Sequence, residues 1–145
     1  MNRTLLFLGF CIALLSASCA HRATPNPPFS SFRVILTSGL TEADEPLDRR
    51  DHFSLSDEAI YVYITWFDVN QDVYPYRLEL HDGSGELVSV HKMDFRPTTD
   101  SWNSWSWYKI KEYVDAPGKW RLTVFLFDEI VHEQPVLVDG PAPAI

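Results

Sequence analysis

The chain has 145 residues, of which 46% are hydrophobic and 22% are charged, and its formal net charge at pH 7 is -8. These values are typical of one acidic globular domain, and the chain is too short for a second folded domain to be expected. They argue against a nucleic-acid partner, because phosphate contacts require clusters of Lys and Arg, and here 12 such residues stand against 20 Asp and Glu.

The first 18 residues are predicted to be a targeting segment and not part of the fold. They carry one charge, Arg3, followed by an apolar run over 5–15. That run is too short for a membrane-spanning helix, which needs ~20 apolar residues. A signal peptide over 1–18 is therefore expected.

Ala17, Ser18 and Cys19 follow the apolar run. They resemble the bacterial lipoprotein signal, in which the cysteine is lipidated and becomes the first residue, although Ser16 stands where leucine is usual. The resemblance implies that a lipid on Cys19 anchors the protein, and Ala20 implies delivery to the outer membrane, facing the periplasm. The alternative is an ordinary secretory signal cut after Ala20, which would leave a secreted periplasmic protein.

Both cysteines, Cys11 and Cys19, belong to this amino-terminal segment. The folded part is then expected to have no disulfide, no thiolate metal ligand and no nucleophilic cysteine. Residues 19–30 contain three prolines and no apolar periodicity, which predicts an extended tether. The domain is expected over 31–139, and 140–145 is expected to be a flexible tail.

Short runs of apolar residues, separated by turn residues, predict seven strands and no helix in this domain. The expected strands are 32–37, 59–67, 74–81, 86–93, 104–114, 119–127 and 130–138. In the strand over 59–67 both faces are apolar or aromatic, so both are expected to be at least partly covered. The connection over 38–58 is rich in Asp and Glu and is expected to be a solvated loop, with weak binding of divalent cations left open.

Gly83 and Gly85 lie between two expected strands and are predicted to adopt the positive φ that a hairpin turn needs. The last hairpin is expected to turn at 128–129. Strands of this length and spacing favour an all-β fold, an immunoglobulin-like antiparallel β-sandwich of about seven strands, with a closed barrel as the alternative. Trp66 and Trp120 are the candidates for a core tryptophan.

Several segments of the predicted domain carry a family resemblance: 36–40, Glu45-Pro46, 61–63, the Trp and Ser residues of 102–107, and 118–124. Together they resemble a small immunoglobulin-like domain of unknown function that is found in bacterial envelope proteins. The middle strand departs from that family, because Arg77-Leu78-Glu79-Leu80 replaces its His-Trp pair. The resemblance implies a sandwich fold but no activity, since the family has none assigned and a shared fold does not transfer function.

A cluster of aromatic residues forms the candidate binding site: Trp102, Trp105, Trp107 and Tyr108. In a strand, Trp105 and Trp107 point to the same side. Exposed indole faces stack on sugar rings or on aromatic and cationic side chains, with a gain of ~1 kcal/mol each. The alternative is that Trp105 and Trp107 only cover one sheet, beneath the aliphatic stems of nearby lysines.

Asp68, Asn70 and Asp72 alternate oxygen ligands as at the start of a calcium-binding loop, and Glu79 falls at its twelfth position. However, Val73 occupies the place where such a loop needs glycine for its sharp turn. An ordinary turn is favoured, and binding of a cation by Asp68, Asn70 and Asp72 is left open.

His81 and His91 could face each other across a hairpin, but two ligands are too few for a closed zinc site. The chain shows no nucleophile elbow and no phosphate-cradling glycine loop, so no catalytic residue, metal or cofactor is expected. The sequence predicts a lipid-anchored, periplasm-facing, non-catalytic binding or assembly module whose partner is an envelope protein or polymer. The alternative is a protein that binds a glycan or small ligand through the tryptophan cluster.

Overall fold

The computed structural model describes residues 31–141. The predicted signal peptide over 1–18, the lipidation site Cys19 and the tether over 19–30 lie outside the described residues, as does 142–145 of the predicted tail. Among the residues that are described, no helix is long and apolar enough to cross a membrane.

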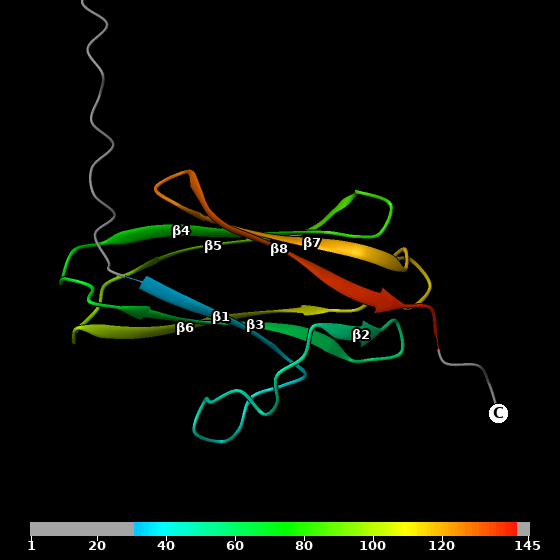
Figure 1. The fold of residues 1–145 in the computed structure, drawn as a ribbon, viewed down its shortest axis with the longest axis horizontal. Helices are drawn as coiled ribbons and strands as arrows, with labels where there is room; N and C mark the ends of the chain where they lie inside the picture. The colour runs from blue at the N-terminus through cyan, green and yellow to red at the C-terminus, as the bar shows by residue number, and fades with distance from the viewer. Residues whose placement is uncertain (1–30, 142–145) are drawn as a thin grey trace, which may run out of the picture.

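Within residues 31–141, eight strands form two sheets that pack face to face (Figure 1). One sheet has three strands in the order β1-β3-β6, and the other has five in the order β2-β8-β7-β4-β5. The strands are β1 (Ser31–Thr37), β2 (His52–Ser54), β3 (Ala59–Phe67), β4 (Tyr74–His81), β5 (Leu87–Phe95), β6 (Ser101–Lys109), β7 (Gly118–Leu126) and β8 (Glu129–Asp139).

The strand connections cross between the sheets, because β3 pairs with β6 and β4 pairs with β7. Neighbouring strands are antiparallel except β2 and β8, which pair in parallel. Crossing connections between two antiparallel sheets are the Greek-key arrangement of immunoglobulin-like sandwiches. The predicted all-β, immunoglobulin-like sandwich is therefore confirmed. The barrel alternative is wrong, because the strands form two separate sheets.

Strand β2 lies within 38–58, where the sequence predicts only a solvated loop. It has three residues, too few for a period of two to show in the sequence. Its Phe53 is 2% exposed, and it pairs with Val138 of β8. The eighth strand therefore depends on a contact between distant parts of the chain.

Strand β6 runs over Ser101–Lys109 and not over 104–114. Beyond it, the backbone N–H of Lys111 donates to the Asp115 carboxylate at 2.7 Å, and the Tyr108 hydroxyl donates to the same carboxylate at 2.8 Å. These hydrogen bonds hold the chain after β6 in a turn, although the apolar alternation continues past the end of the strand.

The core lies between the two sheets and is rich in aromatic rings. Alternate residues of β3 point into it, and Ile60, Ile64 and Trp66 are each 0% exposed. Trp120 of β7 is also 0% exposed, so both candidate core tryptophans are buried. The Phe95 ring stacks on Trp66 with 5.4 Å between ring centroids. These rings pack between the inner faces of the two sheets. The outer face of each sheet is therefore not needed for the core and is free for other contacts.

The two glycines of the β4–β5 turn have different roles. Gly85 adopts the predicted positive φ of 87°, whereas Gly83 is required by close packing, because an added Cβ would lie 1.9 Å from the Pro117 carbonyl oxygen. The last hairpin turns at Phe127 and Asp128, one residue before the predicted position, with φ of 50° and 62°. Positive φ at both central residues is the type I′ geometry that suits a two-residue hairpin.

Candidate functional site

Trp105 and Trp107 lie next to each other on the outer face of the three-stranded sheet. Strand β6 alternates between exposed and buried residues along its length, and these two point away from the core. Trp105 is 38% exposed and Trp107 is 58% exposed. The two indoles therefore lie on the same side of the strand, as the alternation of side chains along a strand predicts.

Trp102 and Tyr108 occupy the opposite face of β6 and point toward the core. Trp102 stacks on Phe95, with 6.4 Å between ring centroids and 4° between ring planes. Tyr108 is 9% exposed, and its hydroxyl donates to Asp115. Grouping all four aromatic residues in one binding surface is wrong, because even and odd positions of a strand point to opposite faces.

Two tyrosines of β3 lie beside Trp105 and Trp107, of which Tyr61 is half-buried and Tyr63 is 6% exposed. Tyr63 stacks on Trp105 with 6.4 Å between centroids and 11° between planes, and Tyr61 stacks on Trp107 with 6.4 Å and 29°. The β3–β6 register places each tyrosine directly opposite its tryptophan. We call Tyr61, Tyr63, Trp105 and Trp107 the aromatic face. Sequence reasoning assigned the two tyrosines to a covered face of 59–67 but did not place them at this site.

A groove of about 530 Å³ borders the aromatic face. Its floor is the outer face of the three-stranded sheet, including Tyr63 and Asn103, and its wall is the β1–β2 connection, including Glu45. In Figure 1 this connection, drawn in cyan, lies on the side of the three-stranded sheet that faces away from the five-stranded sheet. Burial raises the pKa of the Tyr63 phenol, and the nearby carboxylates of Glu45 and Asp44 raise it further.

Asp48 holds the wall of the groove against β1. Its carboxylate accepts hydrogen bonds from the Thr37 hydroxyl (2.8 Å), the Ser38 N–H (2.8 Å), the Ser38 hydroxyl (2.8 Å) and the Arg50 guanidinium (2.6 Å). Burial alone would raise the pKa of Asp48, but these hydrogen bonds outweigh it and hold the pKa well below its usual value. The predicted solvated loop is therefore ordered at Asp48, while Glu42 and Glu45 remain exposed.

We expect Asp48→Asn to destabilise the protein by about 1–2 kcal/mol at pH 7, because an amide cannot accept all of these hydrogen bonds. Since the pKa of Asp48 is lowered on folding, its contribution is present above its ordinary pKa of 3.8 and is lost as pH falls below that value. Urea unfolding from pH 7 to pH 2 measures both effects. The variant should lose less stability over this range than the wild type. Equal losses, or an equal effect of the exposed control Glu42→Gln, would contradict the assignment.

The turn that contains Asp68, Asn70 and Asp72 is held by side-chain hydrogen bonds. The Asn70 side-chain oxygen accepts hydrogen bonds from the Tyr74 hydroxyl (2.8 Å) and the Asp72 N–H (3.0 Å). Glu79 forms an ion pair with Arg77 at 2.9 Å and so is engaged within β4. Between residues 31 and 141, no three His, Cys, Asp or Glu side chains are grouped so that they could hold a metal ion.

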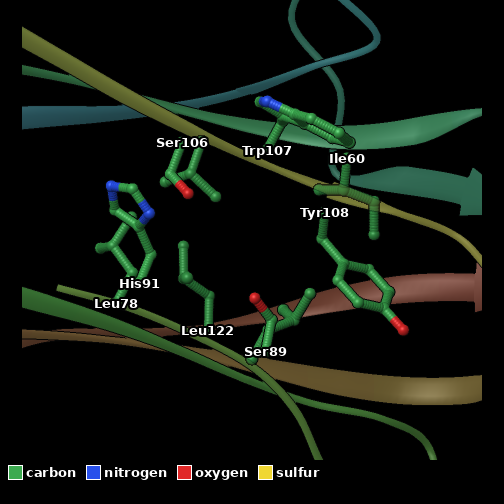
Figure 2. Close-up of a pocket in the computed structure, with 10 residues that line it drawn as sticks. Ile60, Leu78, Ser89, His91, Ser106, Trp107, Tyr108 and Leu122 are labelled. Atoms are coloured by element: carbon green, nitrogen blue, oxygen red, sulfur yellow. The ribbon is translucent and has the colours of Figure 1, made fainter.

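His81 and His91 do not face each other. His91 pairs with Leu78 and His81 pairs with Leu87, so the two imidazoles lie on opposite faces of the five-stranded sheet. Figure 2 shows the His91 ring beside Ser106 at a cavity of about 20 Å³ between the sheets. That volume suits one water molecule and excludes a larger ligand.

No protein-family model and no curated protein matches the chain. Among solved structures it is similar to an immunoglobulin-like protein from Pseudomonas aeruginosa, with a TM-score of 0.48, 12% identity, and 77% of this chain and 99% of that chain covered. It is also similar to a beta-glucosidase from Listeria innocua, with a TM-score of 0.50, 15% identity, and 77% of this chain covered. The chain is an immunoglobulin-like sandwich. It spans 16% of the beta-glucosidase chain, so this likeness concerns the fold alone.

Proposed function

We propose that this protein is a non-catalytic binding module of the bacterial cell envelope, anchored by a lipid on Cys19 and facing the periplasm. It binds an envelope protein or polymer through the aromatic face. The observation that carries this proposal is the exposure of Trp105 and Trp107 side by side, whereas Trp66 and Trp120 are fully buried. Exposed aromatic patches of this kind mark interaction surfaces, in which Trp and Tyr supply much of the binding energy.

The outer face of the five-stranded sheet offers a contrast. There Arg77 lies over the Phe125 ring, with 3.9 Å from its guanidinium carbon to the ring centroid. Arg77 also forms ion pairs with Glu79 and Asp128, each at 2.9 Å. Arg77 is thus paired within this face and covers one of its aromatic rings, while Val90 and Leu137 of the same face are exposed. We favour the three-stranded sheet as the contact surface because its outer face carries two adjacent exposed tryptophans.

Two carboxylates line the groove beside the aromatic face, Glu45 and Asp48, and we assign Glu45, which is exposed, to ligand binding. General acid-base catalysis needs a titratable group that can reach the substrate. The Asp48 carboxylate is already engaged by hydrogen bonds from Thr37, Ser38 and Arg50. No histidine of the described residues lines the groove.

The double variant Trp105→Ala/Trp107→Ala is expected to lose at least 90%, roughly tenfold, of the partner recovered by crosslinking and pull-down from cells, because removal of two hot-spot aromatics costs more than 1.4 kcal/mol of binding. Tyr113→Ala is the matched control, since Tyr113 is 93% exposed and lies in the turn after β6. Equal recovery of partners by the double variant and the wild type would overturn the proposed function.

Cys19→Ala is expected to move the protein from the membrane fraction to the soluble periplasmic fraction. The reason is that the acyl chains on Cys19 provide the anchor, and two or more chains are needed for stable attachment. Fractionation of cells followed by immunoblotting measures this. A membrane fraction that is unchanged in Cys19→Ala would rule out the lipid anchor without affecting the proposal for the aromatic face.

A further inference from the structure

We propose that the groove beside the aromatic face binds an uncharged oligosaccharide, with one sugar ring packed on the Trp105 indole and the neighbouring hydroxyl groups bonded to Asn103, Arg33 and Glu45. This inference rests on the proposed function and names the class of ligand for the same surface. The proposed ligand is a glycan. The experiment below also shows whether the surface binds a polypeptide instead.

The size of the groove fits this ligand. The groove is shallow and open to solvent, and its volume of about 530 Å³ leaves room for a sugar ring that stays partly exposed. Tyr63 lines the groove and stacks on Trp105 from the neighbouring strand, so the indole lies beside the groove, next to its lining residues. Trp107 lies two residues further along β6 on the same face. It extends the flat aromatic surface and provides room for a second sugar ring.

The polar groups around the groove are available to a ligand. The side chains of Arg33, Glu45, Arg49 and Asn103 line the groove and are exposed. Within residues 31–141, none of these four side chains makes a hydrogen bond or ion pair. Arg33 lies over the Phe67 ring, with 5.9 Å from its guanidinium carbon to the ring centroid, and keeps its N–H donors for a ligand. Planar amide, carboxylate and guanidinium groups beside an aromatic ring provide both donors and acceptors for sugar hydroxyls.

The charge of the groove favours a neutral ligand. Arg33 and Arg49 balance Glu45 and Asp48 along its lining, so the local charge is close to zero. The whole chain carries a net charge of -8, and a field of this sign lowers the local concentration of polyanions. An acidic polysaccharide would therefore bind less well than an uncharged one of the same length.

The test is a titration of the full-length chain, purified in detergent, with tetra-N-acetylchitotetraose, cellotetraose and an acidic control, tetragalacturonic acid. Isothermal titration calorimetry measures the affinity, and tryptophan fluorescence reports on the exposed indoles. We expect at least one neutral probe to bind and the acidic control to bind at least tenfold more weakly. Trp105→Ala should weaken binding of the neutral probe by about tenfold or more, and Asn103→Ala should weaken it by a smaller factor.

The matched controls lie away from the groove. Tyr113→Ala removes an exposed aromatic ring outside the groove. Arg121→Ala removes an exposed arginine of the other sheet and is the control for Arg33→Ala, which removes an arginine of the groove. Both controls should bind like the wild type. Failure of both neutral probes to bind, equal binding by Trp105→Ala and the wild type, or preference for the acidic probe would each overturn the inference.

These outcomes are distinct from failure of the proposed function. If the double variant of Trp105 and Trp107 loses a protein partner in the pull-down while neither neutral probe binds, the aromatic face is a protein-binding surface and the inference about a glycan is wrong. If the double variant retains its partners, the proposed function fails whatever the probes do.

Discussion

Trp66→Ala is expected to lower the free energy of unfolding by about 3–5 kcal/mol, the range for truncation of a buried tryptophan. Trp66 is 0% exposed and its ring contacts those of Phe32, Tyr76 and Phe95. Its indole N–H also donates to the Ser104 hydroxyl at 3.0 Å. Since both sheets contribute to this cluster, the cavity left by alanine would weaken the packing between them. A loss of this size is a large part of the ~5–15 kcal/mol that is typical of a domain.

Urea unfolding followed by circular dichroism measures this effect. Trp66→Phe should cost less than Trp66→Ala, because it keeps most of the ring packing and loses the hydrogen bond to Ser104. Trp107→Ala is the matched control at an exposed position and should cost about 1 kcal/mol or less, the contribution of one cross-strand pair. If Trp66→Ala and Trp107→Ala had similar costs, the assignment of Trp66 to the centre of the core would be wrong.

Gly83→Ala is expected to destabilise the protein by about 2–3 kcal/mol, because the new methyl group has no space. Its Cβ would lie 1.9 Å from the Pro117 carbonyl oxygen and 2.6 Å from the carbonyl carbon. These are backbone atoms, so the clash can be relieved only by separating the β4–β5 turn from the segment before β7. That movement would also break the hydrogen bonds from Ala116 N–H to Asp82 (3.1 Å) and from Gly83 N–H to the Ala116 carbonyl (3.2 Å).

Two other glycines separate steric from conformational effects. Gly140→Ala has nothing within 4 Å of the new Cβ and should change stability by less than about 0.5 kcal/mol. Gly85→Ala also has open space but a φ of 87°, and so should cost about 1–2 kcal/mol. Chemical denaturation of the three variants under the same conditions gives the comparison. If Gly83→Ala lowered the stability no more than Gly140→Ala does, the β4–β5 turn and the segment before β7 would not pack as described.

Local patterns were sufficient for the long strands. The run of β-branched and aromatic residues in β3 and the period of two in β4 and β7 depend on neighbouring residues alone, and the predicted bounds agree with the structure within one residue. They were insufficient for β2, because its three residues are recognisable as a strand only through their pairing with β8. They also misplaced the end of β6, because Asp115 turns the chain through hydrogen bonds to Tyr108 and Lys111.

The same distinction applies to the aromatic face. Alternation along one strand predicts that Trp105 and Trp107 share a side, and it separates them from Trp102 and Tyr108 once the direction of one residue is known. It does not predict which of the two sides is exposed. That depends on the second sheet, which covers the face carrying Trp102 and Tyr108.

By itself, the amino-acid sequence determined the acidic character of the domain, its all-β class and the pairing of Trp105 with Trp107 on one side of a strand, because these follow from composition and from contacts between near neighbours. Only the tertiary structure decided that this side is exposed, that Tyr61 and Tyr63 lie beside the two tryptophans, and that the β1–β2 connection forms a groove there. The physical reason is that strand register, sheet stacking and loop placement depend on contacts between residues far apart in the chain.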